Sequence, residues 1–490
     1  MDRLYWARRV GFGLLFFVSM APSLNAAVAK TSPKLVFAYY LMAYPTYSDT
    51  VEGYKQDIRD AQALGIDGFA LNVGGWSDPA VSYYQARAAR MFTAAAQLNT
   101  GFKLFFSVDM CCGMPATDVV NIVSSYATHT NYFKYGGRPV LTSWMGESLG
   151  QNFWQVQVLG NLTQYNPLFV PFFYTNSNNG DWTQPSTENW NNPTYEELSA
   201  SYYTWWSAVV DGLQYYAAPG LAGELAATNE AAARLMREKG KVFIAGTTPY
   251  FWEGRLNAGE PWLLRRYYDT HGGEGIATQW NSIINVQDPP IVMIDTWNDY
   301  GESYVTPADP SLMTLKEYFY NSGPLLKSHA GYAELTKYYI QWYKSGTQPS
   351  VTADAIYYFY RTHSKGVAAV QDKQNVVLYG PEYASLPLDP TPIPAYGEVR
   401  DDIYVTTILT APALLAVTSG DTLAQVAVGA GIQHTRIPFT AGPQSFELIR
   451  NGATILHKTG DVIDAAITKY NFTTTSGFQY GPSSRRPKPR

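Results

Sequence analysis

Two carboxylic acids, Asp299 and Glu302, stand close together in the stretch WNDYGES. Such a pair suits glycosidic cleavage, because one group protonates the leaving oxygen while the other assists water or attacks the anomeric carbon. The neighbouring Trp297 and Tyr300 could desolvate a carboxyl group and raise its pKa. The spacing alone leaves a structural alternative open, in which Asp299 caps a following helix and Glu302 lies in its first turn.

The elements that would position these acids form a regular alternation. From Leu35 to about Asn321, short β-rich runs alternate with longer helical patterns, which is typical of βαβ units around a parallel sheet. The runs are Leu35–Tyr39, Ile66–Leu71, Lys103–Val108, Pro139–Ser143, Leu168–Tyr174, Val209–Leu213, Val242–Ala245 and Ile291–Thr296. Eight buried strands predict an α/β fold of the (β/α)8 TIM-barrel type.

In such a barrel the reacting groups follow the carboxyl ends of the strands. Polar candidates there are Tyr39, Asn72, Asp109, the turn Trp144–Glu147, Tyr174, Asp211, Thr247, Asp299 and Glu302. Asp295 falls within the last run and could face either way. An amide such as Asn72 suits sugar hydroxyls and an indole such as Trp76 suits a ring face. Asp109 could bind substrate or anchor backbone.

The remaining sequence divides the chain further. Residues 1–29 carry basic residues, an apolar run and small residues, as a signal peptide does, so we expect export to the extracellular space, or to the periplasm of a bacterium. The predicted domains are a catalytic barrel at 33–345, a connecting segment packed on it at 346–402, a small C-terminal all-β sandwich at 403–480 and a disordered basic tail at 481–490. Within the sandwich, Asn451-Gly452 predicts a type I′ hairpin turn.

The amino-acid composition restricts the kinds of partner that the protein can bind. A net charge of -5, with charged residues at 15%, leaves no basic face for nucleic acid, whereas aromatic residues reach 15% and suit sugar rings. The six histidines are scattered without ligand spacing, so we expect no metal and no cofactor. Cys111 and Cys112 are adjacent and could be buried thiols, a vicinal disulfide or a reactive site. We expect no membrane partner and a monomer.

Several blocks resemble glycoside hydrolase family 71, the α-1,3-glucanases or mutanases. They are GIDGFALNVG (65–74), GFKLFFSVDM (101–110), YFKYGGRPVLTS (132–143), TWNDYGES (296–303) and YYIQWYKSG (338–346). The resemblance implies a secreted hydrolase that cleaves α-1,3-linked glucan by inversion, without a cofactor, and it places the catalytic acid and base on Asp299 and Glu302. The substrate contacts expected around them are Tyr39, Asn72, Trp76, Asp109, Tyr174, Trp297, Asn298 and Tyr300.

Three departures from the family pattern bear on the substrate. Tyr39 stands where a histidine is expected, GLQYYAAPG (212–220) replaces a motif with Trp and Asp, and the segment TTPYFWEGRL also differs. One alternative is therefore a related α-glycan hydrolase that uses the same two carboxyls with altered subsites. Another is a carbohydrate-binding barrel without catalysis.

Overall fold

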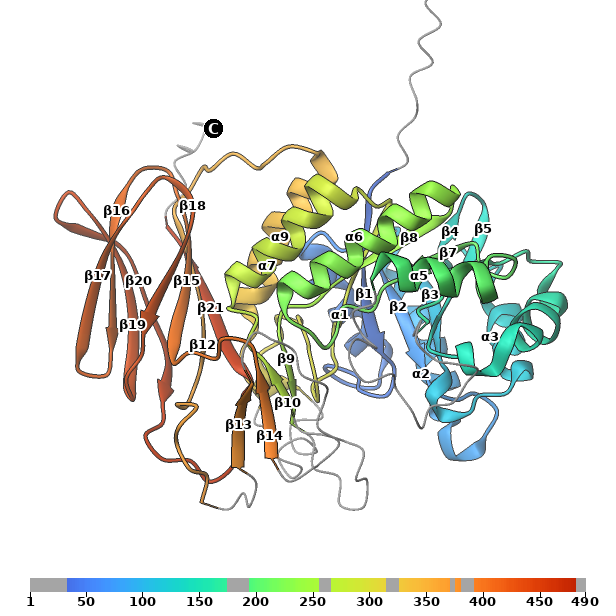
Figure 1. Ribbon diagram of the computed structural model, residues 1–490, viewed down its shortest axis with the longest axis horizontal. Helices are drawn as coiled ribbons and strands as arrows, with labels where there is room; N and C mark the ends of the chain where they lie inside the picture. The colour runs from blue at the N-terminus through green and yellow to red at the C-terminus, as the bar shows by residue number, and fades with distance from the viewer. Residues whose placement is uncertain are drawn as a thin grey trace, which may run out of the picture. The chain divides into compact units, whose positions relative to one another are not determined.

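The structure is a computed structural model that describes residues 33–173, 194–254, 266–313, 326–370, 375–379 and 392–481. The predicted signal peptide, residue Tyr174 and all but the first residue of the predicted tail lie outside these ranges. The described part is a mixed α/β protein in which a curled, largely parallel sheet precedes a region of antiparallel sheets (Figure 1).

The parallel sheet contains, among the described residues, eight parallel strands and one short antiparallel strand. The parallel strands are β1 (Leu35–Leu41), β2 (Gly68–Val73), β3 (Lys103–Asp109), β5 (Arg138–Trp144), β6 (Leu168–Phe169), β7 (Gly212–Gln214), β8 (Val242–Thr247) and β11 (Ile291–Ile294). Their spatial order is β6-β5-β3-β2-β1-β11-β8-β7, and β4 (Lys134–Tyr135) pairs antiparallel with β5. Each of the eight predicted runs overlaps one parallel strand.

The chain segments at the two edges of this sheet, at β6 and β7, are also joined by backbone hydrogen bonds. The backbone amide of Asp211, just before β7, donates to the carbonyl of Phe169 in β6 at 2.8 Å. The amide of Gln214 donates to the carbonyl of Pro171 at 2.9 Å. The sheet therefore curls far enough to bring its first and last strands into hydrogen-bonding distance.

Helices cover the outer side of the sheet. They include α1 (Val51–Ala63), α2 (Tyr83–Leu98), α3 (Ala116–Tyr126), α6 (Ala222–Lys239), α7 (Gly273–Ser282) and α9 (Ala330–Ser345). Helix α6 packs on α7, and α7 packs on α9 (Figure 1). In α1, the Thr50 side chain caps the Gly53 amide, and Tyr54, Ile58 and Ala61 form the buried face. Strand β2 is buried along its whole length, as expected for a strand covered on both faces.

The second part of the chain is built from antiparallel sheets. One has the order β18-β15-β12-β21 and the other β17-β16-β19-β20. Their strands are β12 (Ala355–Arg361), β15 (Asp402–Leu409), β16 (Ala413–Ser419), β17 (Thr422–Val428), β18 (Gly431–Pro438), β19 (Gly442–Arg450), β20 (Ala453–Ile463) and β21 (Thr474–Tyr480). One apolar cluster takes side chains from both, for example Ile356 and Val405 from the first and Phe446 and Leu448 from the second. Strand β12, inside the predicted connecting segment, thus belongs to these sheets.

A third small sheet combines strands from both parts of the chain. It has the order β13-β14-β10-β9, with β9 at Phe251–Glu253, β10 at Arg266–Tyr268, β13 at Asn375–Tyr379 and β14 at Pro392–Tyr396. Strands β9 and β10 come from the segment after β8, and β13 and β14 come from the segment after β12. The sheet therefore ties the parallel region to the later strands.

Two local sequence signals, a hairpin turn and a helix cap, are found in the structure. The hairpin is confirmed, since β19 and β20 pair across Asn451 and Gly452, whose φ values are 54° and 77°. Helix α5 (Tyr195–Ser201) lies in a segment for which sequence analysis predicts no element. A capping box between Thr194 and Glu197 starts this helix, and that sequence signal was overlooked.

Candidate active site

The carboxyl ends of β1, β2 and β3 bring three predicted site residues together. The Asn72 side-chain amide donates to the Tyr39 hydroxyl at 2.8 Å and to Asp109 Oδ2 at 3.1 Å. Ser107 Oγ donates to the same Tyr39 hydroxyl at 3.1 Å. The three strands therefore present one connected polar group, whose carboxylate member belongs to Asp109.

Asp299 and Glu302 lie on a tight turn after β11. The Asp299 amide donates to Thr296 Oγ1 at 2.7 Å, and the Gly301 amide donates to Asp299 Oδ1 at 3.1 Å. Asp299 and Ser303 then form an antiparallel bridge, which closes the turn. In the described chain the next helical residues are Pro310–Leu312, so neither acid starts a helix here. The structure of this turn therefore contradicts the alternative in which Asp299 caps a helix.

Residues Trp297 and Asn298 hold this turn in place. Asn298 is fully buried and binds the β1 loop, accepting from the Leu41 amide at 2.7 Å and donating to the Leu41 and Tyr44 carbonyls at 3.1 and 2.6 Å. The Trp297 indole donates to Asp57 Oδ1 at 2.8 Å. Burial raises the pKa of Asp57 to about 7. Both side chains therefore serve to fix the loop that carries the acids.

Two more predicted substrate contacts are packed among aromatic rings. Trp76 is buried with its ring edge-on to Phe106 at 5.8 Å and to Tyr126 of α3 at 6.3 Å. Tyr300 is buried, with its ring edge-on to Tyr304 at 5.1 Å. Contact of these two residues, and of Trp297, Asn298 and Tyr174, with a sugar stays a prediction, and Tyr174 lies outside the described residues.

The electrostatics connect Asp109 to the turn after β11. Removal from water raises the pKa of Asp109, and the negative charge of Glu302 acts in the same direction. Hydrogen bonds from Cys111 and Asn72 oppose this rise without cancelling it. A carboxyl whose pKa is raised in this way keeps a proton more readily, as a group in acid/base chemistry must. The pKa of Asp109, at the end of β3, therefore responds to the charge of Glu302 on the turn after β11.

Sequence reasoning missed Tyr216, which follows β7. Its ring contacts those of Tyr39, Phe172 and Trp144, with centroids 5.4, 5.8 and 6.2 Å away. Burial raises the pKa of Tyr216, and the charges of Glu302 and then Asp299 add to this effect. Tyrosine is too common in this chain, at 38 residues, for one of them to stand out by type.

The direction of Asp295, left open by the sequence, is settled by the structure. Its side chain is fully buried, and its Oδ2 accepts from the Ala217 amide at 2.9 Å. Burial raises the pKa of this carboxyl well above the usual value. Asp295 therefore points toward the segment that carries Tyr216.

The placement of Asp211 at a carboxyl end is wrong. Strand β7 begins only at Gly212, so Asp211 precedes the strand. Its two carboxylate oxygens accept from the Arg138 guanidinium at 2.8 and 2.7 Å, and Oδ2 also accepts from the Phe169 amide at 3.0 Å. Asp211 therefore stabilises the amino-terminal end of the sheet.

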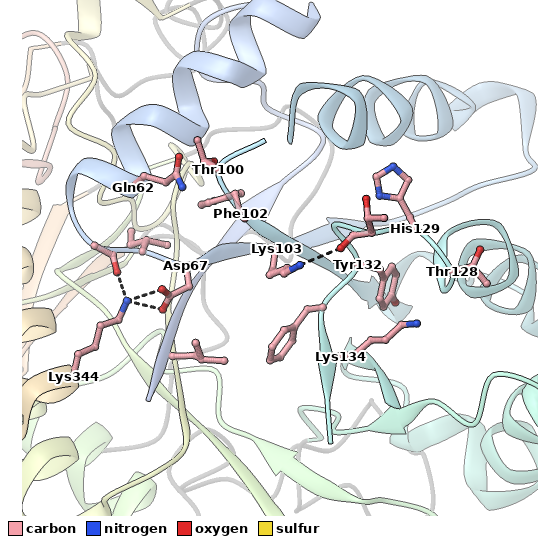
Figure 2. Close-up of a pocket in the computed structure, with 16 residues that line it drawn as sticks. Gln62, Asp67, Thr100, Phe102, Lys103, Thr128, His129, Tyr132, Lys134 and Lys344 are labelled. Carbon is pink, nitrogen blue, oxygen red and sulfur yellow. Dashed lines mark hydrogen bonds and ion pairs between the residues drawn. The ribbon is translucent and has the colours of Figure 1, made fainter. Parts of the chain in front are cut away.

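A cavity of about 760 Å³ opens at that same amino-terminal end, where β1 and β3 begin (Figure 2). Lys344 reaches across part of it and donates to Asp67 Oδ1 at 2.7 Å and to the Gly65 carbonyl at 2.6 Å (Figure 2). Lys103 donates to the Thr130 carbonyl at 3.0 Å. Because the candidate acids follow the carboxyl ends of the strands, at the other end of the sheet, this cavity is not the candidate active site.

No group of three or more His, Cys, Asp or Glu side chains in the described ranges is arranged to hold a metal ion. Among the same residues, no helix is both long enough and apolar enough to cross a membrane.

Among solved structures, the chain is similar to the endo-α-mannosidase of family GH99 from Bacteroides thetaiotaomicron, with 15% identity, a TM-score of 0.46, and coverage of 63% of this chain and 97% of that one. A glucan endo-1,3-alpha-glucosidase from Schizosaccharomyces pombe is 26% identical over 91% of this chain and 95% of its own length. A mutanase from Penicillium rubens is 28% identical over 94% and 92%.

A family model described as glycosyl hydrolase family 71 matches residues 32–486. This range contains the turn with Asp299 and Glu302, the polar group on β1 to β3, and the antiparallel sheets that follow. Since the match covers nearly the whole chain, the protein belongs to glycosyl hydrolase family 71 and is a glycoside hydrolase.

Proposed function

We propose that this enzyme hydrolyses α-1,3-glucosidic bonds in glucan, with Asp299 and Glu302 as its acid/base pair. The observation that supports the proposal most is the turn after β11, which carries both acids, together with the charge of Glu302, which raises the pKa of Asp109 at the end of β3. Relatives named for action on α-1,3-glucan match over nearly their full length and support the linkage. The substrate is a polysaccharide or an oligosaccharide cut from it.

The proposal includes a closed (β/α)8 barrel at 33–345. Its support is the pair of backbone hydrogen bonds that join the chain at β6 and β7, the two ends of the sheet. A closed barrel places all eight carboxyl ends around one opening, so the loops after β1, β3, β7 and β11 can address the same sugar. The proposed sandwich at 403–480 takes in β12 from the segment 346–402 and supports the barrel.

For the mechanism we propose inversion, with Glu302 as general acid and Asp299 as general base. Glu302 has the longer side chain and can reach a leaving oxygen, while Asp299 accepts a hydrogen bond from the Gly301 amide, which favours its ionised form. Water attacks the anomeric carbon as Asp299 removes its proton, and Glu302 gives its proton to the departing oxygen. Inversion requires about 6.5–9.5 Å between the two carboxyls, so that a water fits between them.

A second candidate is a related α-glycan hydrolase with altered subsites. Tyr39 favours it, because this residue replaces the expected histidine and its hydroxyl is bound to Asn72, next to Asp109. A buried tyrosine hydroxyl offers a sugar a different hydrogen bond from an imidazole. The linkage or chain length accepted could therefore differ from those of the named relatives.

The test is release of reducing sugar from insoluble α-1,3-glucan, compared with α-1,4- and α-1,6-glucans and with short α-1,3-oligosaccharides. We expect activity on the α-1,3-linked substrates and at most weak activity on the others, with Asp299→Asn as the inactive control. Preference for another linkage would favour the second candidate. No release from any glycan would contradict both proposals.

Proton NMR of the first product, recorded before mutarotation, tests the stereochemistry. Inversion at an α-linkage yields the β-anomer first. First release of the α-anomer would mean a double displacement, in which one acid acts as nucleophile.

Secretion as a monomer is also proposed. The basic and apolar start of the chain supports export. Recovery of active protein from the culture medium, with a new amino terminus near residue 30, would support it. Light scattering measures the mass, and a dimer would contradict the monomer.

A further inference from the structure

The Tyr39 hydroxyl, near the carboxyl end of β1, accepts two hydrogen bonds. Asn72 of β2 donates to it at 2.8 Å, and Ser107 of β3 donates to it at 3.1 Å. A hydroxyl group has two acceptor positions and one proton, so both acceptor positions are filled and only the proton is left to donate. Tyr39 is 2% exposed, and no residue in the described ranges accepts this proton.

Tyr39 also keeps its proton. Burial raises the pKa of Tyr39 well above its ordinary value, and the charge of Asp109 acts in the same direction. The hydroxyl is therefore neutral near pH 7 and can act as a donor. A buried donor without an acceptor is unfavourable, so an oxygen atom of a bound ligand would stabilise it.

The Asn72 side chain presents the complementary group. Its amide nitrogen uses both hydrogen atoms, one for Tyr39 and the other for Asp109 Oδ2 at 3.1 Å. A rotated amide would set its oxygen against the Asp109 carboxylate, where two acceptors repel. The amide oxygen is therefore turned away from both partners, and within the described part of the chain it accepts no hydrogen bond.

Printed contacts of the backbone place this pair beside the turn that carries the proposed acids. The Tyr39 carbonyl accepts from the amide of Trp297, two positions before Asp299, at 2.8 Å. Two residues after Tyr39, the Leu41 amide donates to Asn298 Oδ1 at 2.7 Å. Strand β1 therefore contacts the start of the turn directly, so a sugar bound at Asp299 is within reach of residues near the end of this strand.

We propose that Tyr39 and Asn72 together bind one hydroxyl group of the glucose residue on the non-reducing side of the cleaved bond. Tyr39 donates to the oxygen of that hydroxyl, and the Asn72 oxygen accepts its proton. A sugar hydroxyl carries one proton and two lone pairs, so it satisfies both side chains at once. This inference deepens the proposed function and rests on it, because it needs a sugar held at Asp299 and Glu302.

The linkage limits which hydroxyl can be bound. In a 1,3-linked glucan the hydroxyls of an internal glucose residue are those at carbons 2, 4 and 6, and one of these three fills the position. A sugar without it would leave the buried groups of Tyr39 and Asn72 unpaired. A site built around such groups rejects the analogue that lacks the hydroxyl, so the two residues determine specificity.

The test combines Tyr39→Phe with three α-1,3-oligosaccharides that lack the 2-, 4- or 6-hydroxyl in this glucose residue. We expect wild-type kcat/KM to fall about tenfold to a hundredfold on one of the three. Tyr39→Phe should lose a similar factor on the unmodified substrate and no more than about twofold further on that analogue, because the contact is already gone. Both enzymes act on the same analogue, so its intrinsic reactivity cancels. Losses that multiply for all three analogues would overturn the proposal.

Tyr132→Phe is the matched control. Tyr132 is also 2% exposed, but its hydroxyl donates to the Val140 carbonyl at 2.9 Å. The variant removes the same atom without touching the site, so its discrimination among the three analogues should match that of the wild type. If it reproduces the pattern of Tyr39→Phe, loosening of the sheet explains both results and the proposal is overturned.

Asn72→Ala tests whether one hydroxyl contacts both side chains. This variant should lose kcat/KM on the unmodified substrate and show no further loss on the same analogue that is coupled to Tyr39→Phe. Coupling to a different analogue, or to none, would overturn the shared contact.

The wild type and Asp299→Asn separate this inference from the proposed function. A wild type that cleaves no α-1,3-oligosaccharide, or a fully active Asp299→Asn, contradicts the proposed function. An active wild type that Asp299→Asn inactivates, together with losses that multiply for every analogue in Tyr39→Phe, contradicts only the role of Tyr39 and Asn72.

Discussion

The two ends of the parallel sheet use carboxyl groups in opposite ways. At the amino-terminal end, Asp67 pairs with Lys344 at 2.6 Å and Asp211 pairs with Arg138 at 2.7 Å. At the carboxyl end, Asp109 accepts from the Asn72 amide and Asp295 accepts from the Ala217 amide. Cations satisfy the acids at one end, and neutral amides bind them at the other.

This difference has a chemical consequence. A cation beside a carboxylate favours its charged form, and the ion pairs of Asp67 and Asp211 tie segments of the chain together. Burial without a cation favours the proton, and the pKa values of Asp109 and Asp295 are raised for that reason. Acids that hold a proton near neutral pH are the ones useful for proton transfer. The comparison thus indicates which end of the sheet reacts without reference to any motif.

The largest expected effect comes from the acids on the turn after β11. Asp299→Asn and Glu302→Gln should each lower kcat/KM by about 10²–10⁴-fold, because each removes a proton-transfer group. Their melting temperatures should stay close to that of the wild type. Initial rates on α-1,3-oligosaccharides and thermal unfolding are the measurements. Asp211→Asn, at the other end, is the control and should remain active. Wild-type turnover in either carboxyl-end variant would remove that residue from the catalytic pair.

A smaller loss is expected from Asp109→Asn. The substitution keeps the shape but removes a titrating group beside Glu302, and it changes the hydrogen bond that Asn72 donates. We expect kcat/KM to fall about tenfold to a hundredfold, below the loss from either acid of the pair. Steady-state kinetics on the same oligosaccharides measure it. A loss as large as that of Asp299→Asn would instead make Asp109 a member of the reacting pair.

The stability of the protein should also depend on pH through Asp57, which accepts a hydrogen bond from the Trp297 indole. Its pKa is raised from 3.8 to about 7 in the folded protein, so the folded state holds this proton more tightly than the unfolded state. The resulting stabilisation is complete below pH 3.8 and is lost as the pH rises through about 7. One such proton contributes about 1.4 kcal/mol per pH unit between these values.

Asp57→Asn removes that titration and is the comparison variant. The difference in unfolding free energy between wild type and Asp57→Asn should shrink as the pH rises from 4 to 7, since only the wild type loses the stabilisation. Urea unfolding at several pH values measures it. Parallel stability curves for the two proteins would show that Asp57 does not titrate in this range.

The smallest effect is expected at the amino-terminal end. Arg138→Met removes the cation that binds both oxygens of Asp211. Both side chains are partly exposed, so the loss of stability should be about 1 kcal/mol. Catalytic rates should be unchanged, because no reacting group is touched. Urea unfolding and initial rates check the two statements. A variant that keeps its stability but loses activity would break the proposed division between the two ends.

Much of the fold could be predicted because strand and turn signals are local. The eight apolar runs that became the parallel strands and the Asn451-Gly452 turn carry their conformation in adjacent residues. The two acids could be found because they follow the last strand. Whether a loop side chain faces a ligand or the core depends on residues that are far away in the sequence. Asn298 illustrates this, because its hydrogen-bond partners lie in and after β1.

Two further differences have similar physical causes. Asp211 was assigned to the wrong end because β7 is short and starts later than its apolar run. Tyr216 gave no signal, because Asp295 and Gly246, which contact the segment that carries it, are brought to this segment only by the folded sheet. Local patterns specify elements, and contacts between remote segments specify the site.

The bond between Asn298 and the Leu41 backbone has a consequence for how the enzyme is made. These residues are 257 positions apart, so the turn with Asp299 cannot be anchored until the last parallel strand has left the ribosome and returned to the first. Contacts this remote form late, because a long loop must close before they are gained. Nascent chains that end before β11 should therefore be inert.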